Sequence, residues 1–167
     1  MSDNNTEQET TQQEQPIFRL QKMYIRDLSF ENPNAPDVFT SKQGEPKVEI
    51  NLGLHNKAIP GDDLYEVSLK ITANVTQGAE GKTLFIAEIE HCGVFLIKNI
   101  PPEHLTAVLA VDAPTMLFPY TRQIISQISV DGGFIPFLME PVNFLALFQN
   151  QQQKAAQEKA AQEKATE

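Results

Sequence analysis

The sequence has little of what most secreted and membrane proteins require. Its 167 residues include a single cysteine, Cys92, and no tryptophan. A lone cysteine cannot form an internal disulfide, which agrees with a reducing compartment. No apolar run approaches the roughly 18 residues that suggest a membrane span, and the N-terminus lacks the basic region and apolar core of a signal peptide. These absences predict a cytoplasmic protein that does not insert into a membrane.

The motifs that carry catalysis and nucleotide binding are also missing. The chain has no GxxxxGK[ST] loop, no GxGxxG and no GxSxG. His91 and Cys92 form an adjacent pair of metal-ligand types, but neighbouring strand residues point to opposite faces, so we expect no metal site. Asp62 and Asp63, in "IPGDDL", fit a turn better than a catalytic pair. The sequence therefore predicts a protein that is not an enzyme and needs no cofactor.

Negative charge exceeds positive charge along the chain. The formal net charge is −9. Residues 1–16 carry −4, and three lysines balance three glutamates over 151–167, so the body, 17–150, carries −5. Such a chain repels the phosphates of nucleic acid, which we exclude as a partner. It attracts basic protein surfaces, so the charge favours a protein partner of that kind.

The two ends differ in composition from the body. Residues 1–16 are rich in Gln and Glu, which predicts a disordered acidic segment. Residues 151–167 repeat KAAQE, with Lys154 and Glu158 at helical i, i+4 spacing. This pattern allows a helix but has no apolar face, so we expect a flexible, solvated tail. A single domain is expected over 17–150.

Four stretches of the body alternate apolar and polar residues, which is typical of half-buried strands. They cover residues 17–30, 47–54, 65–76 and 82–91. The links between them are short, and "QGAEG" at 77–81 suits a hairpin. Consecutive strands with short links predict a four-stranded antiparallel sheet, which can leave one face in water.

Helical spacing replaces this period after "KNIPPEH". The pattern predicts a short helix leading into a longer one over 115–130, which "DGG" at 131–133 ends. A last helix is expected from about Pro141. Strands first and helices second predict an α+β domain whose helices pack on one face of the sheet.

Three segments of the sequence are individually unusual, and their order along the chain is informative as well. They are "DLSFENPNAPDVF" at 27–39, "YEVSLKITA" at 65–73 and "LFPYTRQIISQISVDGGFIPFLMEPVNFLALF" at 117–148. Together they resemble the bacterial SecB protein-export chaperones over roughly residues 17–150. The resemblance implies a homotetramer, a dimer of dimers. The resemblance also implies that the protein keeps unfolded precursor proteins competent for translocation in the cytoplasm and delivers them to the SecA ATPase of the Sec translocase.

Strand parity and the resemblance together suggest a docking surface. If residues 25–31 are extended, Asp27 and Glu31 share one face, and Ile86 and Glu88 share a face of the fourth strand. We expect both faces to lie on the solvent side of the sheet, as one acidic patch. The resemblance implies that Asp27, Glu31, Ile86 and Glu88 bind SecA.

The resemblance also implies a client groove and a subunit interface. Family members bind extended segments in apolar grooves near the last helix and the loop before it. The residues expected to line the groove are aromatic, and they are Phe39, Phe134, Phe137, Phe144 and Phe148. The residues expected at a subunit interface lie on the fourth strand, and they are Ala87, Ile89 and His91.

Two other functions remain open on the sequence alone. A SecB-like holding chaperone for a labile client that is not exported would need the groove but not the acidic patch. An acidic adaptor module would use the patch and no groove.

Overall fold

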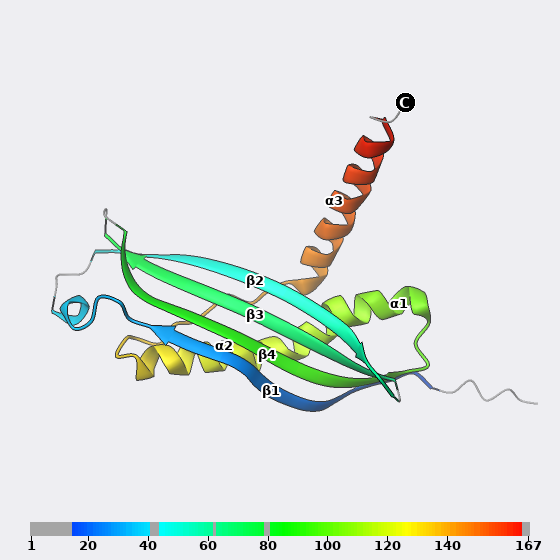
Figure 1. Cartoon of the computed structure of the whole chain (residues 1–167), viewed down its shortest axis with the longest axis horizontal. Helices are drawn as coiled ribbons and strands as arrows, with labels where there is room; N and C mark the ends of the chain where they lie inside the picture. The colour runs from blue at the N-terminus through cyan, green and yellow to red at the C-terminus, as the bar shows by residue number, and fades with distance from the viewer. Residues whose placement is uncertain (1–14, 41–43, 62, 79–80, 165–167) are drawn as a thin grey trace, which may run out of the picture.

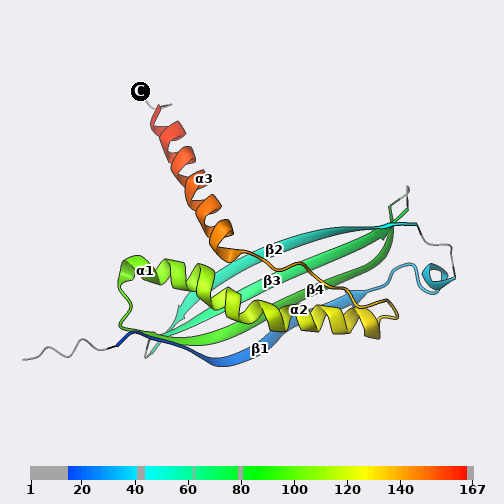
Figure 2. The same ribbon diagram turned by 180° about the vertical axis from the view of Figure 1, so that it is seen from behind.

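Four long strands and a layer of helices make up the described part of the chain, residues 15–40, 44–61, 63–78 and 81–164 of a computed structural model. The strands are β1 (Ile17–Glu31), β2 (Pro46–Ile59), β3 (Leu64–Gln77) and β4 (Lys82–Lys98). They form one antiparallel sheet in the order β1-β4-β3-β2, with the helices on one side (Figure 1, Figure 2). The expected α+β fold is confirmed.

β2 and β4 are longer than the stretches of alternating apolar and polar residues that predicted them, 47–54 and 82–91. β4 continues through "GVFLIK", where apolar residues occupy consecutive positions. Phe95 and Ile97 face the helices, while Val94 and Leu96 are half-buried on the other face. A strand that is covered on both sides reads as a continuous apolar run, so its period disappears from the sequence.

β1 contains two irregularities that set which side chains face the helices. Its pairing with β4 shifts between Leu20 and Lys22 and again between Ile25 and Asp27. Each shift adds one unpaired residue and so moves the following side chain to the other face. The second shift is why Ile25, opposite His91, lies on the helix side, whereas Asp27, only two residues later, lies on the open side.

The helical layer is one nearly continuous run. Helix α1 (Pro102–Ala107) passes through a π-helical turn, Val108–Asp112, into helix α2 (Ala113–Asp131). Pro114 has no N–H to offer the carbonyl of Ala110, and the wider π turn ends two residues before it, at Asp112. The expected short helix leading into a longer one is confirmed.

Helix α2 packs on the sheet through side chains spaced four residues apart, which form one stripe of a helix. All are almost fully buried, and they are Ala113, Leu117, Thr121, Ile125 and Ser129. The hydroxyl of Thr121 lies 2.9 Å from Nδ1 of His91 on β4. Burial lowers the pKa of this histidine, so it is held neutral inside the core. The face of the sheet away from this stripe is called the open face below.

The ends of the chain bear on the expected domain limits. Of the segment 1–16, only Gln15 and Pro16 are described, so its expected disorder lies outside the described residues. Helix α3 (Phe144–Lys164) continues unbroken past residue 150, and the KAAQE repeat is helical as far as it is described. Side chains 149–161 are all exposed, and α3 projects away from the sheet (Figure 1).

We expect Gly93→Ala to destabilise the fold. Gly93 lies on β4 beneath α2, and a Cβ atom there would stand 2.7 Å from the Phe95 ring and 2.9 Å from Leu117. Both neighbours are fully buried, so the helix or the ring must shift, which costs about 1–3 kcal/mol of unfolding free energy. Gly53→Ala is the matched control, because its nearest neighbour is 3.8 Å away. Equal denaturant midpoints for both variants, at one protein concentration, would contradict this account.

Candidate functional site

An aromatic cluster lies at one end of the sheet on the helix side. Phe134, in the segment after α2, is at its centre. Its ring centroid lies 4.9 Å from that of Phe85, 5.3 Å from that of Phe39 and 6.3 Å from that of Phe30. Rings from β1, β4, the β1–β2 connection and the α2–α3 connection therefore meet at one place.

Two features of the end of α2 hold this segment in position. Gly133 has φ +90°, a conformation that favours glycine and lets the chain turn back sharply. Ser129, which is fully buried, then receives the returning chain: its carbonyl accepts the N–H of Phe134 at 3.0 Å, and its Oγ accepts the N–H of Phe137 at 2.9 Å. One serine thus fixes both phenylalanines against the sheet.

Beside this cluster lies a hollow of about 360 Å³, called the aromatic groove below. Its rim is apolar and accessible: Phe39 is 47% exposed, Leu138 67% and Ile135 86%. Val48 on β2 extends the same apolar surface at 45% exposure. Exposed apolar side chains gathered around a hollow of this size are characteristic of a surface that binds another apolar chain.

The structure separates the five phenylalanines that were expected to line a groove. Phe39, Phe134 and Phe137 line the aromatic groove. Phe144 does not, because it is buried in the core with its ring 5.9 Å from that of Phe118. Phe148 lies half-buried on α3 and is absent from the lining. Helical spacing correctly predicted an apolar face at the start of α3, but it could not indicate which residues of that face are buried in the core.

Sequence reasoning also missed lining residues that are not aromatic. Ile135, Pro136 and Leu138 belong to the same loop as Phe134, and Val48 comes from an edge strand. The signal that was available was the run "FIPFL", in which consecutive apolar residues flank a proline and therefore cannot all point inward from a helix or strand.

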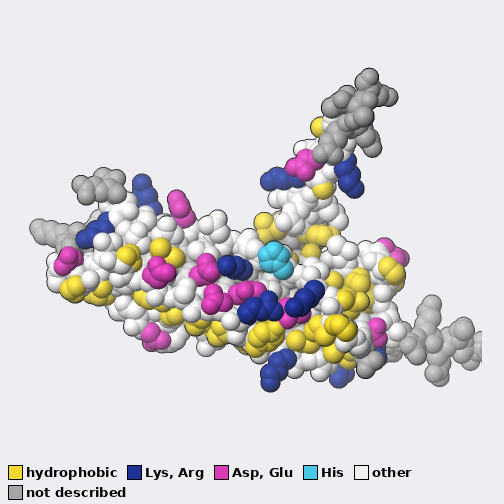
Figure 3. Space-filling view, viewed as in Figure 1, with side chains coloured by type: hydrophobic (Ala, Val, Ile, Leu, Met, Phe, Trp, Pro, Cys, Tyr) yellow, Lys and Arg dark blue, Asp and Glu magenta, His cyan; other side chains and the backbone are white. Residues whose placement is uncertain are grey.

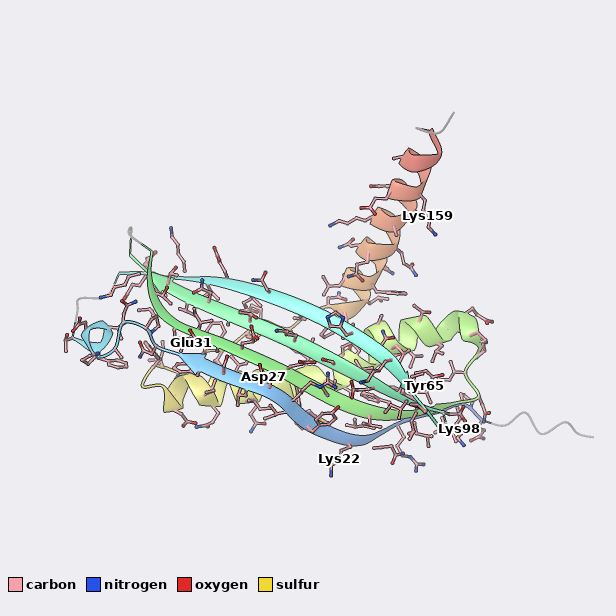
Figure 4. The ribbon with its side chains drawn as sticks, in the orientation of Figure 1. Lys22, Asp27, Glu31, Tyr65, Lys98 and Lys159 are labelled. Atoms are coloured by element: carbon pink, nitrogen blue, oxygen red, sulfur yellow. The ribbon has the colours of Figure 1, made fainter. Side chains whose placement is uncertain are left out.

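The expected side-by-side position of the acidic residues is confirmed by the strand register. Asp27 lies opposite Glu90, Ser29 opposite Glu88, and Glu31 opposite Ile86, all on the open face. Figure 4 labels Asp27 and Glu31 on β1, and Figure 3 shows acidic side chains gathered over the sheet. We call Asp27, Glu31, Ile86 and Glu88, together with the exposed Glu49 opposite Asn74, the acidic face.

Cations within the chain compensate part of this charge. Lys70 Nζ lies 2.9 Å from Glu88 Oε1, and the Thr72 hydroxyl donates to the other oxygen of Glu88 at 3.0 Å. Asp27 and Glu31 make no ion pair with any described residue. The surface is therefore less uniformly negative than the sequence suggested. Its carboxylates without an ion pair to a described residue are Asp27 and Glu31 on β1 and Glu49 on β2.

Next to the acidic face, the same side of the sheet carries a closed polar network. Glu66 accepts hydrogen bonds from Tyr24 and from Arg26, the latter at 2.5 Å, and Lys57 lies 3.4 Å away. Arg26 also pairs with Glu90 at 2.6 Å. Burial favours a raised pKa for Glu66, but the hydrogen bonds from Tyr24 and Arg26 outweigh it and lower the pKa to about 2.

The three residues expected at a subunit interface lie inside the chain instead. Ala87, Ile89 and His91 are 1%, 0% and 3% exposed. All three point to the helix side of β4, where α2 and the neighbouring strands cover them. A side chain enclosed by its own subunit has no surface for another one, so this expectation needs correcting.

Accessible apolar surface lies instead at the edge strand beside them. Ile25 and Leu28 on β1 are 45% and 39% exposed, and Tyr120 on α2 is 48% exposed. They border a hollow of about 620 Å³ between β1 and α2, which we call the edge groove.

Two classes of site have no support in the described residues. No group of three or more His, Cys, Asp or Glu side chains is placed to hold a metal ion there. His91 and Cys92 do point to opposite faces, as expected, with His91 toward α2 and Cys92 opposite Tyr24 and Ser68. No helix in this part of the chain is long and apolar enough to cross a membrane.

The sequence matches a family model over most of its length. The model, described as preprotein translocase subunit SecB, covers residues 11–155. The protein-export protein SecB of Desulfotalea psychrophila is 63% identical over 139 residues, which span 83% of this chain and 88% of that protein. The protein-export protein SecB of Magnetococcus marinus is 49% identical over 159 residues, 94% of this chain and 97% of that one.

A solved structure shares the fold. It is a SecB-like chaperone of Mycobacterium tuberculosis in complex with a ChAD peptide from the HigA1 antitoxin. The TM-score is 0.62 at 15% identity, covering 75% of this chain and 90% of that one. Similarity at this identity concerns the arrangement of sheet and helices.

We expect Glu66→Gln to change how stability depends on pH. The folded pKa of about 2 lies below the usual value of 4.5, so the unfolded chain takes up the proton first. The carboxylate therefore contributes fully above pH 4.5, and its contribution, about 3 kcal/mol at most, is lost as pH falls towards 2. The variant should be less stable at pH 7 and lose less stability between pH 5 and 2. Glu49→Gln, on the same face and without an ion pair to a described residue, is the control. Identical pH slopes for wild type and Glu66→Gln would contradict the prediction.

Proposed function

Because the chain belongs to the SecB family of protein-export chaperones, we propose that it binds unfolded precursor proteins in the cytoplasm and delivers them to SecA. The observation that carries the proposal is the aromatic groove, with its exposed rim of Phe39, Ile135 and Leu138. An apolar hollow that does not require particular side chains in its ligand suits unfolded chains of many sequences. Native proteins bury such segments and would not bind.

Holding a client in this way requires no catalysis. A protein that binds the unfolded form and not the native form keeps its client unfolded by mass action alone. We therefore propose that the chain acts without nucleotide, metal or cofactor of its own. Release would come from transfer to the next protein rather than from a chemical step.

Delivery to SecA is proposed to use the acidic face. Asp27 and Glu31 on β1 are exposed and free of ion pairs in the described part of the chain. Ile86 on β4, opposite Glu31, would add an apolar contact with SecA. The family resemblance of these positions supports the assignment, as does their common side of the sheet. Charges of this kind mainly raise the association rate and select the partner, so added salt should weaken docking.

Assembly into a homotetramer, a dimer of dimers, is part of the same proposal. The surfaces that support it are the edge groove and the exposed side of α2, where Ile25, Leu28 and Tyr120 present apolar atoms. These replace Ala87, Ile89 and His91, which have no exposed surface to contribute.

We expect Phe39→Ala to weaken client binding about tenfold, because burying a Phe side chain contributes roughly 1.5–3 kcal/mol and part of the contact would remain. The measurement is fluorescence anisotropy with a labelled exported precursor, kept reduced and unfolded, and with its folded form as a negative control. Phe39 is half exposed, so the unfolding free energy should change little. Phe144→Ala is the matched variant, since its buried ring supports the core and its loss should cost about 3–5 kcal/mol of stability. Unchanged affinity of Phe39→Ala would argue against the groove.

We expect Asp27→Lys and Glu31→Lys to weaken SecA binding about tenfold at low salt, and less at high salt because the charges are exposed and screened. Glu103→Lys, in the first turn of α1, changes the net charge equally at a site away from the sheet and should have little effect. Native mass spectrometry of each variant reports the tetramer. If reversal at Asp27 and Glu31 leaves the chaperone's function intact while Phe39→Ala impairs it, a holding chaperone for a non-exported client is favoured. Loss of SecA binding with no effect of Phe39→Ala would favour an acidic adaptor.

A further inference from the structure

Two cations of the open face, Arg26 and Lys70, hold their acids in different ways. Arg26 bridges two carboxylates, Glu66 at 2.5 Å and Glu90 at 2.6 Å, and Glu66 is buried, with only 10% of its side chain exposed. A guanidinium that donates to two acids at once is not readily replaced. Lys57, 3.4 Å from Glu66, is the second cation here, so the two acids and two cations of this half of the open face carry no net formal charge.

Lys70 holds its acid much more loosely. Among the described residues it makes one ion pair, with Glu88 at 2.9 Å, and 46% of its side chain is exposed. Glu88 itself is 30% exposed, so solvent and other molecules can reach both partners. The hydrogen bond with Glu88 raises the pKa of the Lys70 ammonium, and the charges of Glu90 and Asp27 add to the effect, so lysine stays charged in these surroundings.

The position of Lys70 makes this pair matter for docking. In the register, Lys70 lies across from Glu90, and Glu90 lies across from Asp27. Glu88 is in the next row, between Ser29 on β1 and Thr72 on β3. Lys70 thus stands at the border between the neutralised half and the acidic face, with its ammonium on the carboxylate that a basic partner would need.

We propose that Lys70 is a built-in competitor, a counter-ion that occupies Glu88 in the free chain and has to be exchanged for a basic group of the docking partner. This inference rests on the proposed docking at the acidic face and adds the residue that limits its affinity. Exchange is feasible because an exposed ion pair contributes little and the lysine stem can swing into solvent. A partner that lacks a basic group at that point would gain nothing from Glu88, so Lys70 also contributes to specificity.

The test is SecA affinity for Lys70→Gln, measured at low salt. We expect binding to become about two- to fivefold tighter, which is the range that an exposed ion pair supplies. Lys22→Gln is the matched control: Lys22 is exposed on β1, makes no ion pair with a described residue, and changes the net charge equally (Figure 4). Its effect on affinity should stay below about 1.5-fold. Weaker binding by Lys70→Gln would mean that Lys70 contacts the partner directly, and unchanged binding would mean that it does not compete; either overturns the inference.

A double-mutant cycle with Glu88→Gln separates competition from general repulsion. If Lys70 acts by occupying Glu88, then Lys70→Gln should no longer tighten binding once Glu88 is neutral. A gain that persists in the Glu88→Gln background overturns the mechanism. Asp27→Lys, measured alongside, distinguishes failure of the inference about Lys70 from failure of the proposed docking at the acidic face. If Asp27→Lys weakens binding and Lys70→Gln does not tighten it, only the inference fails; if Asp27→Lys has no effect, the proposed docking fails and the inference with it.

Discussion

A single helix, α2, packs a stripe of side chains spaced four residues apart, from Ala113 to Ser129, onto the middle of a four-stranded sheet. Gly93 permits this close approach. One helix is narrower than the sheet it covers, so the open face, the β1 edge and the far end of the helix side all remain accessible. Each surface to which we assign a role lies in one of these three regions. The functional surfaces follow from how little of the sheet one helix can cover.

The aromatic groove shows how a fold can keep apolar surface exposed without collapsing on it. The rings of Phe30, Phe85 and Phe134 pack on one another and form a firm floor. Ser129 ties the returning loop to the end of α2, and Ile135 and Leu138 on this loop remain largely exposed. Hydrogen bonds from the Ser129 side chain and carbonyl to the loop backbone hold this side of the groove, so its position does not depend on the sequence of the chain that it binds.

Much of the fold follows from the sequence, and the failures have identifiable physical causes. Alternation located all four strands, and face parity placed Asp27 and Glu88 together. The bulge at Arg26 was missed, although the apolar residues at 18, 20, 23, 25, 28 and 30 indicate it by their spacing, which alternates between two and three residues.

For the candidate site, Phe144 and Phe39 could not be told apart, since burial depends on which element lies opposite. The family resemblance suggested an interface at Ala87, Ile89 and His91, but β4 is a central strand and these side chains are buried beneath α2. The ion pairs of Lys70 and Arg26 join neighbouring strands, which no local pattern reveals.

Helix α3 has a different relation to stability from the rest of the chain. Phe144, in its first turn, is buried, but from residue 149 to residue 161 every side chain is exposed, and an isolated helix of that length is marginal in water. Its distal turns can therefore open and close without breaking any contact of the core. In hydrogen exchange we expect two separate regimes within one chain: amides of β3 and β4 exchanging by global unfolding, and amides of distal α3 exchanging by local fraying. Substitutions in the KAAQE repeat thus act on the order of this arm alone, which frees its sequence to vary independently of the domain.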